Sequence, residues 1–171
     1  MSLVLSGNSG SLTVDSSNGI TFPNSTTQAS GGKVIQVVQA TYSTQVTTSS
    51  SSYIDTGLTV SITPLFSTSK ILVMIVQAEC QKPNNTASGA YGLQLVRNST
   101  VITNFGLFLG YNASSSVGGG ASNQSCIYLD SPATTSSTTY KTQVVAQNGV
   151  TGVFVQGDNS TSTITLMEIA Q

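Results

Sequence analysis

Few side chains in this sequence could do chemistry. The chain has six Asp and Glu residues, five Lys and Arg residues and no histidine, beside a large excess of Ser and Thr. A hydroxyl becomes a nucleophile only when a neighbouring base takes its proton, and histidine is the side chain that most often serves as that base. We therefore expect no enzyme activity and no catalytic residue.

Paired carboxylates are the best enzymatic alternative, because two of them suffice to hydrolyse a glycosidic bond. Nothing in the spacing of the carboxylates pairs two of them, so a polysaccharide-degrading activity is the less favoured reading. The acid and the nucleophile would come from Asp15, Asp55, Glu79, Asp130, Asp158 and Glu168.

Metal, cofactor and nucleic-acid sites find no support in the sequence. No calcium-loop spacing connects the aspartates, and Asp55 and Asp158 precede turn residues that they would cap. The glycine run 118–120 lacks the lysine of a phosphate-binding loop, so we interpret it as a loop tip. Five scattered basic residues make no electrostatic surface for nucleic acid. We expect no metal, no cofactor and no nucleic acid.

Carbohydrate recognition is the one binding chemistry whose side chains are present. Sugars are held by an aromatic face together with fixed amide and hydroxyl groups. Tyr111 and Asn112 lie in a long turn-rich region, and Asn84 and Asn85 lie in another. We predict these four residues as glycan contacts, while a packing role for the tyrosine stays open. The loops that would carry the contacts are residues 81–89 and 111–124, because long loops on a rigid sheet tend to bind.

The composition describes a polar surface with almost no charge. Charged residues make up 6% of the chain and the formal net charge is −1, whereas an ordinary soluble domain carries about a quarter charged residues. Copies of such a protein repel one another very little. With 38% hydrophobic residues the chain is expected to fold. We predict a folded protein that packs against copies of itself or against another protein.

The local periodicity predicts strands and almost no helix. Residues 58–63 alternate apolar and hydroxyl side chains, and residues 91–95 and 140–146 repeat the alternation. Turn-rich segments such as Asn148-Gly149 separate these strands. We predict an all-β antiparallel sandwich, with the eight-stranded jelly roll as the commonest version. Core and subunit contacts would come from Val34, Val38, Leu58, Val60, Ile62, Ile71, Val73, Ile75, Leu93, Leu95, Ile127, Leu129, Val144, Ile164 and Leu166.

The run from Ile71 to Val76 is apolar at every position. A strand of this kind is covered on both faces, either in the centre of a sandwich or at a subunit contact. It is far shorter than the ~20 residues of a membrane helix, so we expect no membrane insertion. Cys80 and Cys126 sit at the ends of apolar runs. We expect both to be free buried thiols, with a disulfide between them as the alternative.

The first thirty residues contain few large apolar side chains, too few for a core of their own. Gly31 and Gly32 then mark a flexible hinge before the first strong strand. We predict an extended anchoring or intertwining segment over residues 1–31 and a β head over residues 33–171.

Three stretches carry a family resemblance. They are SLTVDSSNGITFPNSTTQAS at residues 11–30, GGKVIQVVQATYSTQVTTSSSSYIDTGLTVSITPLFSTSKILVMIVQ at residues 31–77 and STITLMEIAQ at residues 162–171. Together they resemble the tail-fibre and virion-fibre proteins of tailed bacteriophages, including many that infect cyanobacteria. The element Gly19-Ile20-Thr21-Phe22-Pro23 resembles one found near the shaft of those proteins. The block around Tyr53 to Leu58 and Ser69 to Val73 resembles part of their C-terminal head.

The resemblance implies a homotrimer on the exterior of a virion. Its head would be a jelly roll like those of tumour-necrosis-factor-like and complement-C1q-like trimers, and its N-terminal segment would bind other virion proteins. The head would be a tail-fibre tip that touches a host-surface glycan. Many members carry long repetitive shafts, whereas only about thirty residues precede the head here. A capsid fibre or decoration protein is therefore the alternative.

Overall fold

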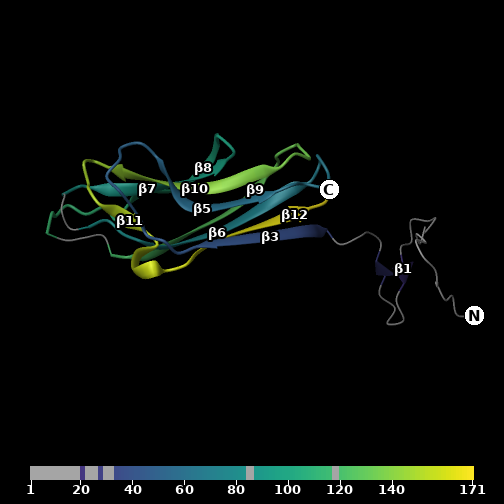
Figure 1. Ribbon diagram of the computed structural model, residues 1–171, viewed down its shortest axis with the longest axis horizontal. Coiled ribbons are helices and arrows are strands. Elements are labelled where there is room, and N and C mark those ends of the chain that lie inside the picture. Colours follow the sequence, from purple (N-terminus) through teal and green to yellow (C-terminus); the bar gives the residue numbers. More distant parts are fainter. Residues whose placement is uncertain (1–19, 22–26, 29–32, 84–86, 117–119) are drawn as a thin grey trace, which may run out of the picture. The chain divides into compact units, whose positions relative to one another are not determined.

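The computed structural model describes residues 20–21, 27–28, 33–83, 87–116 and 120–171 (Figure 1). The chain divides into two compact units, Met1–Lys33 and Val34–Gln171. In the first unit the described residues form a short antiparallel pair, β1 (Ile20–Thr21) with β2 (Thr27–Gln28). Most of the predicted anchoring segment over residues 1–31 thus lies outside the described residues.

The second unit is a sandwich of two four-stranded antiparallel sheets, which we name after a central strand of each. The β6 sheet has the order β3-β12-β6-β9 and the β10 sheet has the order β5-β10-β7-β8. Numbered along the chain, these eight strands follow the orders 1-8-3-6 and 2-7-4-5, which is the jelly-roll connection. The bounds are β3 (Val34–Tyr42), β5 (Ile54–Ile62), β6 (Lys70–Cys80), β7 (Ala90–Arg97), β8 (Thr100–Leu109), β9 (Ser122–Asp130), β10 (Thr138–Gln147) and β12 (Ser162–Ile169). The predicted all-β antiparallel sandwich is confirmed.

Two small elements complete this unit. β4 (Val46–Thr48) pairs with β11 (Val153–Val155), and a 3-10 turn spans Gly157–Asn159. The described ranges contain no α-helix. Among the residues that were placed, no helix is long and apolar enough to cross a membrane.

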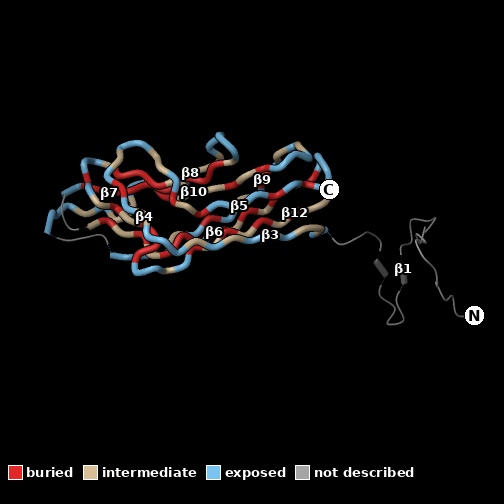
Figure 2. Tube along the Cα trace, viewed as in Figure 1, coloured by how far each residue is buried: buried red, intermediate tan, exposed pale blue. Residues whose placement is uncertain are grey.

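The core lies between the two sheets, where buried stretches of both layers face each other (Figure 2). It consists of two apolar clusters, one around Ile75 and Leu166 and one around Tyr91 and Val144. A chain of buried hydrogen bonds lies between these two clusters. Thr142 Oγ1 on β10 donates to Gln77 Oε1 on β6 at 2.8 Å, and Gln77 Nε2 donates to Ser162 Oγ at 3.1 Å. These bonds fasten one sheet to the other, and they satisfy polar groups that would be costly to bury alone.

Most of the predicted core residues are buried, but three are not. Val34, Ile127 and Leu129 are exposed in the single chain, so the prediction is wrong for them as core residues. The period of two explains this, because Ile127 and Leu129 alternate with the inward-facing Cys126 and Tyr128. Those that are buried are Leu58, Ile62, Ile71, Val73, Ile75, Leu93, Leu95, Val144, Ile164 and Leu166, and Val38 and Val60 pack partly buried against them.

The run from Ile71 to Val76 is covered on one face only in the single chain, so the interpretation of it as the centre of the sandwich is wrong, and the alternative, a subunit contact, stays a prediction. Ile71, Val73 and Ile75 are buried, whereas Leu72 and Met74 are half-buried and Val76 is exposed. A strand in a two-layer sandwich has only one inner face, so its other face meets solvent unless something else covers it.

Cys80 and Cys126 are free and buried, as expected. Burial raises the pKa of the Cys80 thiol to about 12, with a further contribution from the neighbouring Glu79 carboxylate. Burial also raises the pKa of Cys126. Both thiols therefore remain protonated near neutral pH, and a thiol is a poor nucleophile compared with a thiolate.

We expect native protein to resist alkylation at both cysteines. Iodoacetamide at mildly alkaline pH should add nothing to the folded chain, and it should add two groups after unfolding in urea, as counted by mass spectrometry. Rapid alkylation of Cys80 in the folded protein would contradict its burial. Failure of the unfolded protein to take up two groups without reductant would instead indicate a disulfide.

Candidate functional site

The loops that were predicted to bind lie at one end of the sandwich. At the opposite end, which we call the Val34 end, Val34 pairs with Ile169 and Ile169 pairs with Lys70. The end that carries these loops we call the loop end. Here β6 finishes at Cys80, which pairs with Ser122 of β9. The two predicted loops, residues 81–89 and 111–124, both start at this end of the molecule (Figure 1).

The backbone of Ser88 brings the two loops together. Its N–H donates to the Asn112 carbonyl oxygen at 2.8 Å, and its carbonyl oxygen accepts from Asn148 Nδ2 at 2.9 Å. A third segment, the turn at Asn148 and Gly149, thereby joins the predicted pair of loops. The Asn-Gly dipeptide identifies a tight turn in the sequence, but nothing in the sequence indicates that this turn reaches Ser88.

Of the predicted glycan contacts among the described residues, Tyr111 is the one whose side chain is exposed to solvent and could meet a ligand. Its side chain is 55% exposed, and its hydroxyl lies 3.5 Å from Ser88 Oγ, which is long for an O–H···O bond. Asn112 shapes the loop, because its Oδ1 accepts from the Ser114 N–H at 3.2 Å. Asn84 and Asn85 lie outside the described residues.

A second exposed aromatic side chain, Phe108, lies three residues before Tyr111. Phe108 has a φ of 55° and Ser88 has a φ of 57°, so both occupy the left-handed region that non-glycine residues rarely adopt. The Phe108 N–H donates to Gln147 Oε1 at 3.2 Å. Seven further non-glycine residues among those described share this backbone region, so the conformation shapes these turns without marking a site by itself. Phe108 was not among the predicted contacts, because the sequence of β8 gives no sign that it is exposed whereas Phe105 packs against the core.

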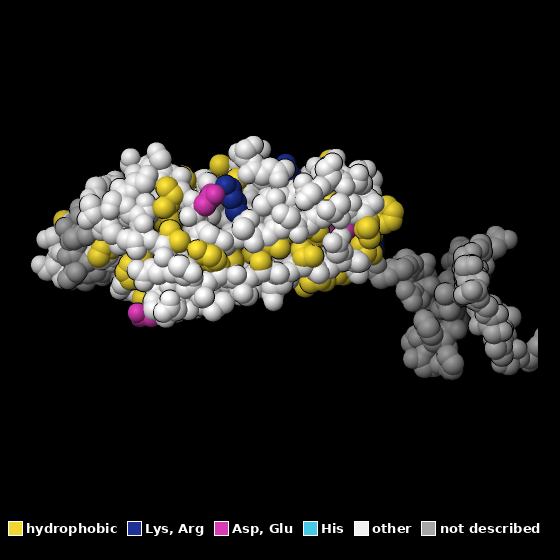
Figure 3. Space-filling view, in the orientation of Figure 1, with side chains coloured by type: hydrophobic (Ala, Val, Ile, Leu, Met, Phe, Trp, Pro, Cys, Tyr) yellow, Lys and Arg dark blue, Asp and Glu magenta, His cyan; other side chains and the backbone are white. Residues whose placement is uncertain are grey.

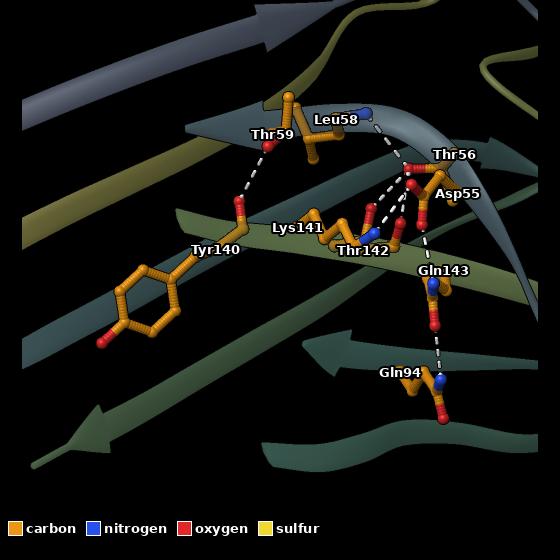
Figure 4. A network of polar contacts seen from close by, with 9 residues as sticks. All are labelled: Asp55, Thr56, Leu58, Thr59, Gln94, Tyr140, Lys141, Thr142 and Gln143. Carbon is orange, nitrogen blue, oxygen red and sulfur yellow. Dashed lines mark hydrogen bonds and ion pairs between the residues drawn. The ribbon is translucent and has the colours of Figure 1, made fainter. Parts of the chain in front are cut away.

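Asp55 belongs to a polar ladder that crosses three strands of the β10 sheet (Figure 4). It accepts from Lys141 Nζ at 2.8 Å and from Gln143 Nε2 at 2.6 Å, and Gln143 in turn accepts from Gln94 Nε2. Burial alone would raise the pKa of Asp55, but the hydrogen bonds from Lys141 and Gln143 outweigh it and lower this pKa. The hydrogen-bond partners of Asp55 are therefore side chains of the neighbouring strand, and these bonds hold strands of the sheet together.

Asp130 lies at the Val34 end in a buried cluster. It accepts two hydrogen bonds from Arg97 Nη1, at 2.9 and 2.8 Å, and one from the Tyr140 hydroxyl at 2.6 Å. Burial, followed by the bond to Asp130 and the charge of Asp130, raises the pKa of Tyr140 well above its usual range. The tyrosine therefore acts as a permanent hydrogen-bond donor to the carboxylate.

Glu168 is buried on β12 and fastens the connection between β5 and β6. Its Oε1 accepts from the Leu65 N–H at 2.8 Å and the Phe66 N–H at 3.3 Å, and its Oε2 accepts from Gln36 Nε2 at 3.0 Å. Among the described residues no two carboxylates share a hydrogen-bond partner. Across the same ranges no three Asp, Glu or Cys side chains gather in a group that could hold a metal ion.

The surface is largely neutral, with charged atoms in only a few small spots on the side drawn in Figure 3. The sequence matches no protein-family model and no curated protein. A solved structure with a similar fold is that of the infectious bursal disease virus VP2 subviral particle. The match has a TM-score of 0.42 and 11% sequence identity, and it covers 80% of this chain and 37% of that one. The chain thus spans little more than a third of that protein, and a similarity at this level adds nothing about function.

Proposed function

We propose that this chain is a homotrimeric structural protein of a virion, displayed on the particle exterior as the tip of a tail fibre that touches the host surface. The sequence resemblance to phage fibre proteins, the jelly roll and the scarcity of charge all support this proposal. The observation that carries it is the position of the loops. They lie at the loop end, whereas the chain enters β3 at the Val34 end.

Both ends of the sandwich unit lie at the Val34 end. Val34 opens β3 and pairs with Ile169, two residues before the end of the chain. An attachment through the N-terminal segment to other virion proteins therefore holds the Val34 end and leaves the loop end free. We therefore place the binding surface at this free end.

The chemistry at the loop end suits a neutral saccharide. Exposed aromatic faces at Tyr111 and Phe108 would stack on a sugar ring, and amide groups at Asn148 and Gln147 lie close to Ser88 and Phe108. Three copies on one axis would turn a weak single contact into avid binding. A host-surface glycan is therefore the class of ligand that we propose.

The alternative is a capsid fibre or decoration protein, which would use the same fold. A polysaccharide-degrading fibre is a more distant alternative. Gold-labelled antibody against the protein, applied to intact particles, distinguishes a position at the tail tip from one on the capsid. We expect label at the tail tips. Label confined to the capsid would favour the alternative, and particles that carry no label at all would overturn a virion role.

We expect Tyr111→Ala to weaken binding of the purified protein to host cells by about tenfold or more, because a lost stacking contact of ~1.4 kcal/mol corresponds to a factor of ten. Phe66→Ala is the matched control, since Phe66 is equally exposed, at 55%, but lies at the Val34 end. Its binding should equal that of the wild type in a flow-cytometric titration. Equal loss in both variants would contradict a binding site at the loop end.

A further inference from the structure

The outer face of the β6 sheet is apolar in its centre. Strand register places Val37, Met167, Leu72 and Leu129 side by side in one row across all four strands. The next row toward the loop end is Gln39, Thr165, Met74 and Ile127, and the row after that is Thr41, Thr163, Val76 and Ser125. We call the apolar members of these rows the apolar sheet face: Val37, Leu72, Met74, Val76, Ile127, Leu129 and Met167.

This face is open to solvent in the single chain. Ile127 is 75% exposed and Leu129 is 50% exposed. A shallow hollow of about 270 Å³ lies over Met74, Val76 and Ile127, with hydroxyl side chains at its border. Three rows about 6.8 Å apart on four strands about 4.8 Å apart make a patch of roughly 400 Å². Seven of these twelve positions are apolar, so the contiguous apolar part covers roughly 230 Å² of it. Open apolar area gathered in one place, with polar residues beside it, is the kind of surface at which proteins associate.

The three rows contain no charged side chain. Lys70, which pairs with Ile169 toward the Val34 end, is the nearest charge on the same face. The polar groups in the rows are partly satisfied within the sheet, since Gln39 Nε2 donates to Thr165 Oγ1 at 2.9 Å. The face can therefore be covered by a neutral surface without burying an unpaired charge.

We infer that the apolar sheet face is the surface through which copies of this chain associate. The inference rests on the proposed homotrimer and names the part of the molecule that forms it. A second copy fits this face because its own surface carries few charges and because a chain with a net charge of −1 is hardly repelled by another copy. A strongly acidic or basic partner would find no ion to pair with on these rows.

The size and arrangement of the face agree with such an interface. Interfaces bury an apolar core inside a polar rim, and here the apolar rows are bordered by Thr, Ser and Gln. The three rows together, polar positions included, cover roughly 400 Å², about half of the ~800 Å² that each partner buries in a standard interface. In a closed ring of three, each chain would cover its neighbour's face with a different part of its own surface.

Light scattering on the full chain tests the inference. We expect the wild type to have about three times the 17.6 kDa mass of one chain, and Ile127→Lys to weaken association by about 100-fold or more, so that single chains predominate at micromolar concentration. Val101→Lys is the matched control. Val101 is 50% exposed on β8, an edge strand of the other sheet, and this variant should remain trimeric.

Circular dichroism confirms that each variant is folded, and Ile127→Thr, which keeps a β-branched side chain, replaces Ile127→Lys if the latter does not fold. A trimeric wild type with a trimeric Ile127 variant would overturn this inference and leave the proposed function standing. A wild type with the mass of one chain would overturn the trimer itself. Dissociation of the Val101→Lys control as well would show that the effect is not confined to the apolar sheet face.

Discussion

Replacing Arg97 by alanine should lower the free energy of unfolding by about 2–4 kcal/mol, because the change leaves a buried carboxylate without its cation. The side chain of Asp130 is 8% exposed, and it keeps only the Tyr140 hydroxyl as a partner once Arg97 is removed. The expected loss shows as a lower urea midpoint with an unchanged slope.

The chain supplies a matched control for this prediction. Lys141 pairs with Asp55 at 2.8 Å, the same nearest distance as in the pair of Arg97 and Asp130, but the side chain of Asp55 is 53% exposed. An exposed ion pair contributes at most about 1 kcal/mol. Lys141→Ala should therefore change the unfolding free energy by less than about 1 kcal/mol. Equal losses in the two variants would contradict the view that burial decides the strength of these pairs.

Glu168→Gln should lower the unfolding free energy at neutral pH by about 1.5–3 kcal/mol. The carboxylate accepts charge-assisted hydrogen bonds from the Leu65 and Phe66 N–H groups and from Gln36 Nε2. A glutamine of the same shape loses the charge, and its amide group cannot accept the bond from Gln36. The connection between β5 and β6 should loosen as a result.

The same variant should change how stability depends on pH. Burial on its own would raise the pKa of Glu168, but the hydrogen bonds that it receives outweigh burial and lower this pKa in the folded protein. The stabilisation is therefore complete above the unfolded-state pKa of about 4.3 and is lost as the pH falls through the lower folded-state value. Asp55 titrates in the same direction, so the difference between the wild type and Glu168→Gln isolates the contribution of Glu168. Urea unfolding across the acidic range measures it, and identical pH profiles would contradict it.

The strands could be predicted from the sequence because their alternation is local. Leu58 and Ile62 appear at every second position of their segment, and both are buried on β5 as that pattern requires. Which face of a strand packs against the core and which face meets solvent could not be predicted in this way for every strand. The run from Ile71 to Val76 is apolar throughout, so its sequence cannot tell which residues face the core and which form an outer surface.

The arrangement at the loop end was only partly predictable. Tyr111 and Asn112 stood out as polar and aromatic residues in a turn-rich segment, and the structure places them beside Ser88. The contribution of Asn148 depends on a contact across 60 positions in the chain, which no local pattern encodes. Phe108 has a left-handed backbone and lies at an irregularity in the pairing of β7 with β8, where Tyr91 pairs with Leu109 and Leu93 pairs with Gly106, and such an irregularity has no signature in an ordinary strand sequence.

Native mass spectrometry of the unmodified chain tests the central claim most directly, because a sandwich with few charges and an open apolar face is proposed to be one member of a homotrimer. We expect a dominant species of about three times 17.6 kDa that persists on dilution to micromolar concentration. A dominant species with the mass of one chain at every concentration would contradict it.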